Sequence, residues 1–180
     1  MFLSRSEVEY LGHIVSNQGI APNLKKIEAI QKYLAPNNSD ELRSFLGLVN
    51  YYRRFVRQMG HIAHPLTELA NWKLEGPGKD AYESLKQQLI SAPILGYPDF
   101  TKPFVVNTEA SDYGIDAVLS QTTNNNDSQE PMETEVVIAY TSKHLNPNEP
   151  KWCTPEKATF AIIHAIKSRF TPTSTVLNSR

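Results

Sequence analysis

The sequence predicts an α+β fold in two small units, and three observations support that prediction. A polar Ser16–Gly19 turn interrupts apolar residues within segment 8–20, which is typical of a β-hairpin. Apolar residues then recur at helical spacing through residues 23–70. Beyond a Gly-Pro-Gly stretch, three β-type segments precede one more helix. The composition, with 40% hydrophobic and 21% charged residues among 180, is that of a globular protein.

Three helices are expected in the first unit. Asn23 is a good N-cap for a helix that Pro36 ends. Ser39 starts a second and longer helix, whose apolar side runs from Leu42 to Val56. A third, short helix covers residues 62–70.

The stretch 71–80 is the best linker in the chain, so the predicted division is 1–70, 71–80 and 81–180. A helix over residues 80–91 opens the second unit. The remaining predicted elements are strands 104–108, 115–121 and 136–141, a polar loop before the third strand, and a helix from Thr154 to about Arg169.

Composition excludes several classes of protein. No apolar run approaches the ~20 residues that span a bilayer, and the N-terminus has no signal-peptide core, so no membrane partner is expected. The single cysteine, Cys153, rules out an internal disulfide and any cysteine-based zinc site. We expect Cys153 to be buried beside Trp152 and not to act as a nucleophile. An intracellular, reducing compartment fits best.

Charge is unevenly distributed, although the net charge is only −1. Four arginines and no acid lie between Arg43 and Arg57, whereas residues 109–135 carry seven acids and no base. Any nucleic acid would therefore be attracted by the first unit. The expected contact stripe on the long helix consists of Arg43, Asn50, Arg54 and Arg57. The alternative interpretation of this stripe is a solvated helix face.

Four blocks of sequence, in order, resemble the Pol polyprotein of Ty3/gypsy-type retrotransposons. The blocks are Tyr10–Ser16, Leu42–Leu48 continuing into Tyr51–Phe55, Leu85–Phe100, and Thr108–Ile115 followed by Ile138–Ser142 and Glu156-Lys157. The likeness covers nearly all of residues 8–170.

The resemblance implies a fold and partners. The first block is similar to the hairpin that ends the palm of reverse transcriptase and grips the primer, which assigns nucleic-acid contact to Leu11, Gly12 and His13. The second is similar to the thumb, and the rest to a truncated RNase H-like α/β domain with three strands and the first helix. The implied partners are RNA/DNA hybrid or duplex nucleic acid and the rest of a Pol polyprotein.

The resemblance also implies two-metal chemistry with Mg²⁺, for which most ligands are missing. The family's palm aspartates lie upstream of the first block, so polymerase activity is not expected of this chain alone. The first RNase H carboxylate, an aspartate in the family, is here Glu109, and the second falls on Ala158. No acid follows Glu156. Since Mg²⁺ tolerates little error in ligand geometry, Glu109 is a degenerate catalytic and metal position.

Other residues are weaker candidates. Asp112 and Asp116 lie near Glu109, and the favoured interpretation is a solvated turn and a strand-edge carboxylate. The five histidines have no metal-ligand spacing; they are His13, His61, His64, His144 and His164.

Three functional hypotheses remain open: an inactive remnant of a reverse transcriptase/RNase H, a non-catalytic nucleic-acid-binding module, and an internal slice of a longer Pol protein. In the RNase H-like fold the first strand also pairs with a fourth. Strand 104–108 is therefore expected to leave an apolar edge unpaired, and the second unit to be marginally stable.

Overall fold

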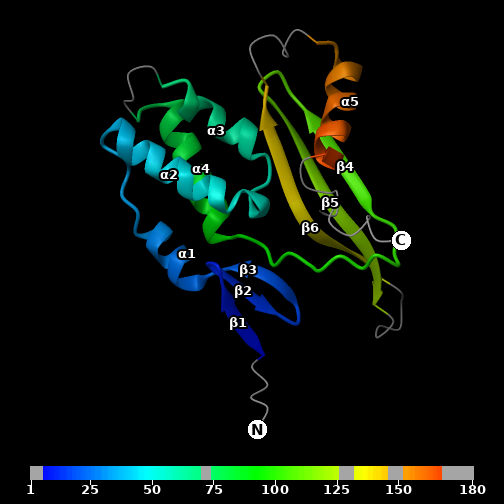
Figure 1. Cartoon of the computed structure of the whole chain (residues 1–180). Coiled ribbons are helices and arrows are strands. Elements are labelled where there is room, and N and C mark those ends of the chain that lie inside the picture. Colours follow the sequence, from blue (N-terminus) through cyan, green and yellow to red (C-terminus); the bar gives the residue numbers. More distant parts are fainter. Residues whose placement is uncertain (1–5, 70–73, 126–131, 146–151, 168–180) are drawn as a thin grey trace, which may run out of the picture.

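The computed structural model describes residues 6–69, 74–125, 132–145 and 152–167. A small sheet, a group of helices and a second, longer sheet lie side by side, and one further helix packs on the second sheet (Figure 1). The predicted α+β class is confirmed.

The first sheet is antiparallel and has the strand order β1-β2-β3. Its strands are β1 (Glu7–Tyr10), β2 (His13–Ser16) and β3 (Gly19–Pro22). The predicted hairpin is confirmed as β2 and β3, which pair Ser16 with Gly19. Strand β1 was not predicted, because all four of its residues are exposed and it carries no buried alternation.

Four α-helices follow: α1 (Leu24–Gln31), α2 (Ser39–Tyr51), α3 (Met59–Thr67) and α4 (Pro77–Ile90). The predicted cap of α1 is confirmed, since the side chain of Asn23 accepts a hydrogen bond from the Lys25 amide at 2.8 Å. The cap of α2 is Asn38, one residue before the predicted Ser39, and it accepts from the Glu41 amide at 2.8 Å.

The prediction that the second helix continues to Val56 is wrong. Helix α2 ends at Tyr51, and a short 3₁₀ turn, η1 (Arg53–Phe55), follows. Phe55 and Val56 are neighbours in sequence, and both are 1% exposed. The chain thus leaves the α-helix at this point while both residues stay in the core.

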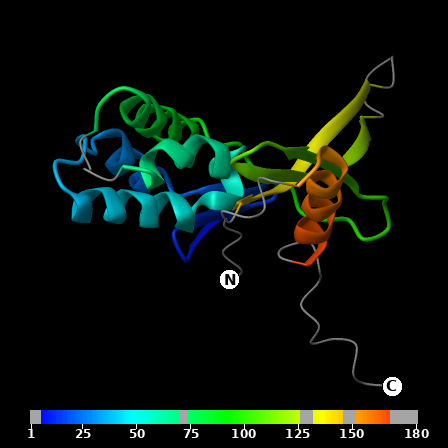
Figure 2. The same ribbon diagram turned by 90° about the horizontal axis from the view of Figure 1, so that it is seen from above.

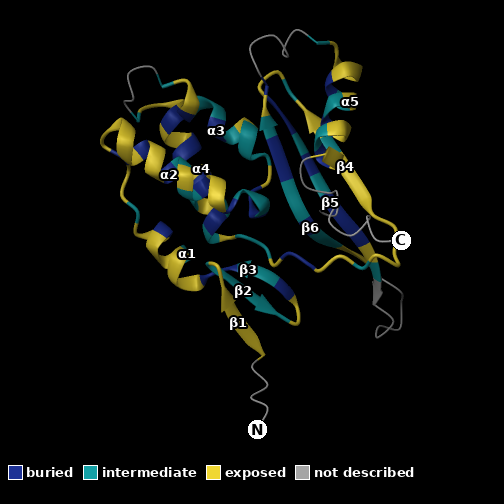
Figure 3. Ribbon diagram, in the orientation of Figure 1, coloured by how far each residue is buried: buried dark blue, intermediate teal, exposed yellow. Residues whose placement is uncertain are grey.

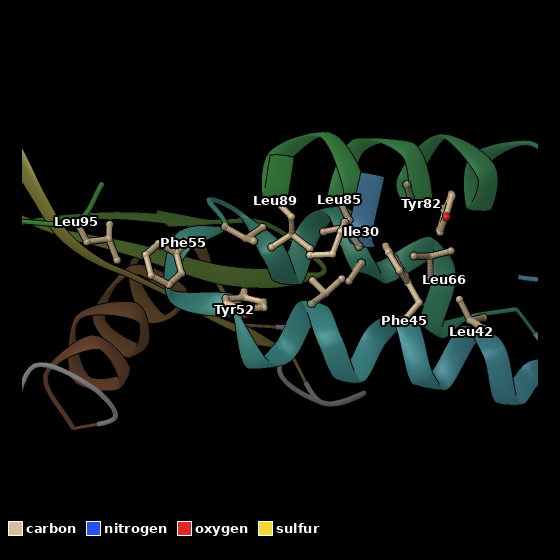
Figure 4. Close-up of a cluster of buried hydrophobic side chains, with 14 residues drawn as sticks. Ile30, Leu42, Phe45, Tyr52, Phe55, Leu66, Tyr82, Leu85, Leu89 and Leu95 are labelled. Atoms are coloured by element: carbon tan, nitrogen blue, oxygen red, sulfur yellow. The ribbon is translucent and has the colours of Figure 1, made fainter. Parts of the chain in front are cut away.

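Helix α4 completes the core of the helical group. Ile30, Phe45, Leu85 and Leu89 are fully buried, with α4 on one side of them and α2 on the other (Figure 4). The Tyr82 hydroxyl donates to the main-chain oxygens of residues 33 and 34, at 3.0 and 3.1 Å. In space, α4 therefore packs with helices of the first unit within residues 24–67, while the sequence division at 71–80 stays a prediction.

The second sheet is antiparallel with the order β4-β5-β6, and α5 packs on it. Its elements are β4 (Val105–Ala110), β5 (Gly114–Asn125), β6 (Met132–His144) and α5 (Thr154–Ala165). Ile115 clusters with Ala161 of α5, so its neighbour Asp116 points to the other face of β5 and lines a hollow together with Arg57 and Gln58. Figure 2 shows α5 and the helical group set apart along this sheet. Residues 126–131 of the predicted loop and the predicted helix end at Arg169 lie outside the described residues.

Strand β4 lies at an edge of this sheet, because within the described segments it pairs with β5 alone. Val105 and Val106 are 40% and 37% exposed there (Figure 3). The expected apolar edge is present among these residues. None of the described helices has the length and apolarity needed to cross a membrane.

Two glycines give opposite predictions for stability. At Gly19 (φ +143°) an added Cβ would lie 2.2 Å from the Leu95 carbonyl oxygen, which accepts from the Ile20 amide at 2.8 Å. Gly19→Ala should therefore lower the free energy of unfolding by about 2 kcal/mol or more. A Cβ at Gly47, on the exposed face of α2, meets nothing within 4 Å.

Gly47→Ala is the matched control and should raise stability by about 0.5–1 kcal/mol, as expected for a helix interior. Urea unfolding followed by circular dichroism measures both variants. Equal stability of Gly19→Ala and the parent chain would contradict the close approach of β3 to Leu95.

Candidate functional site

The turn between β1 and β2 rests on the end of α2. The Tyr51 hydroxyl donates to the Leu11 carbonyl, and the Tyr52 hydroxyl donates to the Gly12 carbonyl at 2.9 Å. Gly12 has a φ of +72°, which favours glycine. His13 donates from Nδ1 to the Leu11 carbonyl at 2.8 Å. The three residues predicted to grip a primer are therefore held as one turn against the helix.

This turn continues into an exposed face of α2. Leu11 and Tyr51 are 68% and 53% exposed, and Arg43 and Asn50 are exposed on the same helix. Arg43 contacts Asp40 at 3.3 Å, but both side chains are about four-fifths exposed or more, so the pair is weak. We call Leu11, Arg43, Asn50 and Tyr51 the grip surface.

The other two arginines of the predicted stripe leave this surface, because α2 ends before them. Arg54 is half-buried, with its guanidinium carbon 5.8 Å from the centre of the Phe55 ring. Arg57 donates to Glu109 Oε1 at 2.8 Å, and Gln58 donates to Oε2 of the same carboxylate. The predicted single stripe is thus reduced to Arg43 and Asn50, and Arg57 faces the second sheet.

Glu109 lies in a hollow of about 480 Å³ between the helical group and the second sheet. Asp116 pairs with it in register across β4 and β5, and Glu135 and Arg57 also line the hollow. The hydrogen bonds from Gln58 and then from Arg57 hold the pKa of Glu109 below its usual value. Glu109 is thus an ionised carboxylate with both oxygens engaged.

The pKa of Asp116 is shifted in the opposite direction. Burial, followed by the negative charge of Glu109, raises its pKa from 3.8 to about 7, although Arg57 acts against the shift. Its Oδ1 is shielded and has no hydrogen-bond partner among the described residues. The expectation of a solvated strand-edge carboxylate is therefore wrong, because the helical group covers this face of β5.

The remaining carboxylates near α5 have structural partners. Asp112 accepts from the ammonium of Lys157 at 2.6 Å, and that lysine is only 7% exposed. Glu156 accepts from the Cys153 amide at 2.8 Å in a capping box at the start of α5. Cys153 is exposed, which corrects the prediction of a buried thiol, since a helix-capping position lies at the surface.

These residues do not form the carboxylate set that a pair of Mg²⁺ ions requires. Mg²⁺ prefers near-octahedral oxygen ligands at ~2.0–2.1 Å. Both Glu109 oxygens are engaged by Arg57 and Gln58. Asp116, with a pKa of about 7, is only partly ionised near neutral pH, and Ala158 offers no oxygen from its side chain.

One cluster of possible metal ligands was not predicted from the sequence. His64, Glu68 and His144 place one possible ligand atom each within 4.8 Å of one another. The interpretation that no histidine has metal-ligand spacing missed this, because His144 comes from a distant strand and no local motif includes it. His164 lines the same hollow as His64 and His144, and burial lowers its pKa, with further lowering by Lys143 and Arg53.

A family model for the RNase H-like domain found in reverse transcriptase matches residues 77–171. The chain belongs to this family. Reverse transcriptases and RNase H-like domains generally use divalent metal ions.

Relatives extend the similarity over the first unit. The chain is 38% identical over 176 residues to the retrovirus-related Pol polyprotein from transposon opus of Drosophila melanogaster, covering 89% of this chain and 17% of that polyprotein. It is 33% identical to the transposon Tf2-3 polyprotein of Schizosaccharomyces pombe, covering 91% and 12%. The resemblance to Ty3/gypsy-type Pol is confirmed, and the chain spans less than a fifth of these relatives.

Solved structures of a viral reverse transcriptase are similar to this chain as well. The foamy viral protease-reverse transcriptase in complex with RNA/DNA hybrid matches with a TM-score of 0.71 and 27% identity, over 90% of this chain and 22% of that one. A complex of that viral protein with double-stranded DNA matches with a TM-score of 0.69 and 28% identity, over 90% of this chain and 34% of that one. The reverse transcriptase fold thus covers both units of the chain.

The raised pKa of Asp116 predicts how stability depends on pH. Between about pH 4 and pH 7 the folded chain keeps a proton on Asp116 that the unfolded chain has released, because the pKa moves from 3.8 to about 7 on folding. The folded state binds more protons in this window, so this group lowers the free energy of unfolding as pH rises.

Asp116→Asn should therefore flatten the pH dependence of stability between about pH 4 and pH 7, and be more stable than the parent chain at about pH 8. Urea unfolding across this range is the measurement. Asp80→Asn, at an exposed position in the first turn of α4, is the control and should keep the parent's profile. An unchanged slope in Asp116→Asn would contradict the burial of this carboxyl.

Proposed function

We propose that this chain is a nucleic-acid-positioning part of a retrotransposon reverse transcriptase, with its grip surface placed against a duplex or an RNA/DNA hybrid. Family membership and the Pol relatives support the proposal, as do similar foamy viral structures in complex with double-stranded DNA and RNA/DNA hybrid. Its further partners would be other parts of a Pol polyprotein, in an intracellular setting.

The observation that carries the proposal is the attachment of the β1–β2 turn to α2. The hydroxyls of Tyr51 and Tyr52 donate hydrogen bonds to the carbonyls of Leu11 and Gly12. These two hydrogen bonds tie the turn to the helix. Arg43 lies two helical turns before Asn50, roughly 10 Å along the axis. The surface therefore offers a fixed turn beside a cation and an amide, and both suit contact with a phosphate backbone.

We further propose that the RNase H-like unit of this chain holds no functional pair of Mg²⁺ ions and does not cleave RNA. The Arg57 guanidinium is placed where a cation would approach Glu109, and its charge already compensates that carboxylate. Asp116, with a pKa of about 7, is only partly ionised near neutral pH, and position 158 holds an alanine.

Binding of a labelled RNA/DNA hybrid at low salt tests the grip surface. Arg43→Ala should weaken binding about tenfold and reduce the slope of log affinity against log salt by about 1, as expected for one lost phosphate contact. Asn50→Ala should weaken binding less, because it removes no charge. Tyr51→Phe should also weaken binding, since it releases the turn without changing charge.

Lys79→Ala is the matched control, because Lys79 is an exposed cation on α4, across the core from α2. It should leave affinity and salt slope unchanged. Equal effects of Arg43→Ala and Lys79→Ala would mean that attraction is non-specific, and the proposed surface would then be wrong.

The same hybrid tests the catalytic part of the proposal. In Mg²⁺, and separately in Mn²⁺, the chain should bind without cleaving. Metal-dependent cleavage that disappears in Glu109→Gln would overturn the proposal and make Asp116 and Asp112 the next ligands to test.

A further inference from the structure

We propose that His64, Glu68 and His144 bind one Zn²⁺ ion, which joins α3 to the end of β6. This site lies apart from the hollow around Glu109. It adjoins the grip surface, because Asn50 lines the same hollow as His64 and His144. The proposed Zn²⁺ binding rests neither on nucleic-acid binding nor on Glu109. Its possible ligand atoms lie within 4.8 Å of one another, one from each residue.

The backbone brings these side chains together from both units. His64 lies in the last turn of α3, and the Glu68 amide donates to its carbonyl at 3.2 Å, so the two residues are one helical turn apart. His144 is the last residue of β6, where it pairs with Gly114. The Gly60 amide donates to the Ser142 hydroxyl oxygen at 3.1 Å, which fixes α3 against this end of the strand.

The surroundings of His64 indicate a ligand. Its ring stacks between Tyr113, with centroids 4.4 Å apart, and His144, at 5.2 Å. Its Nδ1 is shielded and has no hydrogen-bond partner among the described residues. A buried polar atom without a partner is unfavourable, and a coordinated metal ion is one way to satisfy it. Glu68 and His144 are exposed, so an ion can reach the cluster from solvent.

The types of ligand atom favour Zn²⁺ over Mg²⁺ and Ca²⁺. Two imidazoles and one carboxylate are a ligand combination that Zn²⁺ takes in proteins, with a fourth position left for water. Mg²⁺ and Ca²⁺ prefer oxygen ligands and should compete poorly. Tetrahedral Zn²⁺ holds its ligand atoms about 3.4 Å apart, so the side chains must close in by roughly an ångström. Rotation of the two exposed side chains suffices for this.

Two cations, Arg53 and Lys143, line the same hollow as the two histidines, and both contact other groups. Lys143 directs its ammonium over the Phe160 ring, 4.2 Å from the centroid, and Phe160 belongs to α5. Arg53 donates to the Ser142 carbonyl. The alternative to a metal is a purely aromatic stack of Tyr113, His64 and His144, which would have no affinity for Zn²⁺.

The experiment uses the tag-free full chain, stripped with a chelator and dialysed. Zn²⁺ is titrated by calorimetry, and Co²⁺ is titrated by its visible absorption, which reports tetrahedral coordination. We expect one ion per chain, an increase in melting temperature with Zn²⁺, and no competition from excess Mg²⁺. His64→Ala and His144→Ala should each weaken Zn²⁺ binding at least tenfold and abolish the thermal shift, and Glu68→Gln should weaken it less.

His61→Ala is the matched control, because His61 is an exposed histidine on the same helix outside the cluster. It should bind Zn²⁺ as the parent chain does, and circular dichroism establishes that every variant is folded. No binding by the parent chain, or unchanged binding in both His64→Ala and His144→Ala, would overturn the site. Full affinity in Glu68→Gln would overturn the three-ligand assignment.

Discussion

The change of chain direction after Tyr51 is the constraint on which the arrangement of the two units depends. Helix α2 ends at Tyr51, and the 3₁₀ turn that follows keeps Tyr52, Phe55 and Val56 buried. That turn directs Arg53 and Arg57 at the second sheet. The Arg57–Glu109 pair is more than half exposed on both sides, so on its own it adds about 1 kcal/mol or less. Burial in the turn, rather than the ion pair, positions the units.

The same turn also places a cation, Arg57, beside the acidic second sheet. Seven acids without a base in residues 109–135 would repel one another if they all faced water. Arg57 compensates Glu109, and Asp116 on the neighbouring strand keeps its proton up to about pH 7, because burial and the charge of Glu109 raise its pKa. Arg57 of the first unit and the proton on Asp116 of the second therefore both reduce the negative charge where the two units meet. The carboxylates are therefore adapted to docking of the units.

Structural features that depend on only a few neighbouring residues were predicted correctly from the sequence. Asn23 caps α1 and the Ser16–Gly19 turn joins β2 to β3, because capping and turn preferences act within a few residues. The exposed thiol of Cys153, the buried carboxyl of Asp116 and the approach of His144 to His64 were not predictable in this way. Each depends on which element packs where, and no spacing within one segment encodes that.

The match of the family to residues 77–171 and the packing of the chain divide the molecule differently. Helix α4 begins the matched segment, yet Tyr82, Leu85 and Leu89 complete the core of the first unit. Leu95 then exchanges two main-chain hydrogen bonds with Ile20 of β3, each 2.8 Å long. A cut before α4 would expose the apolar side of α2 and remove the two hydrogen bonds between β3 and Leu95. The segment before the second sheet therefore packs with the first unit, although its sequence matches the RNase H-like domain.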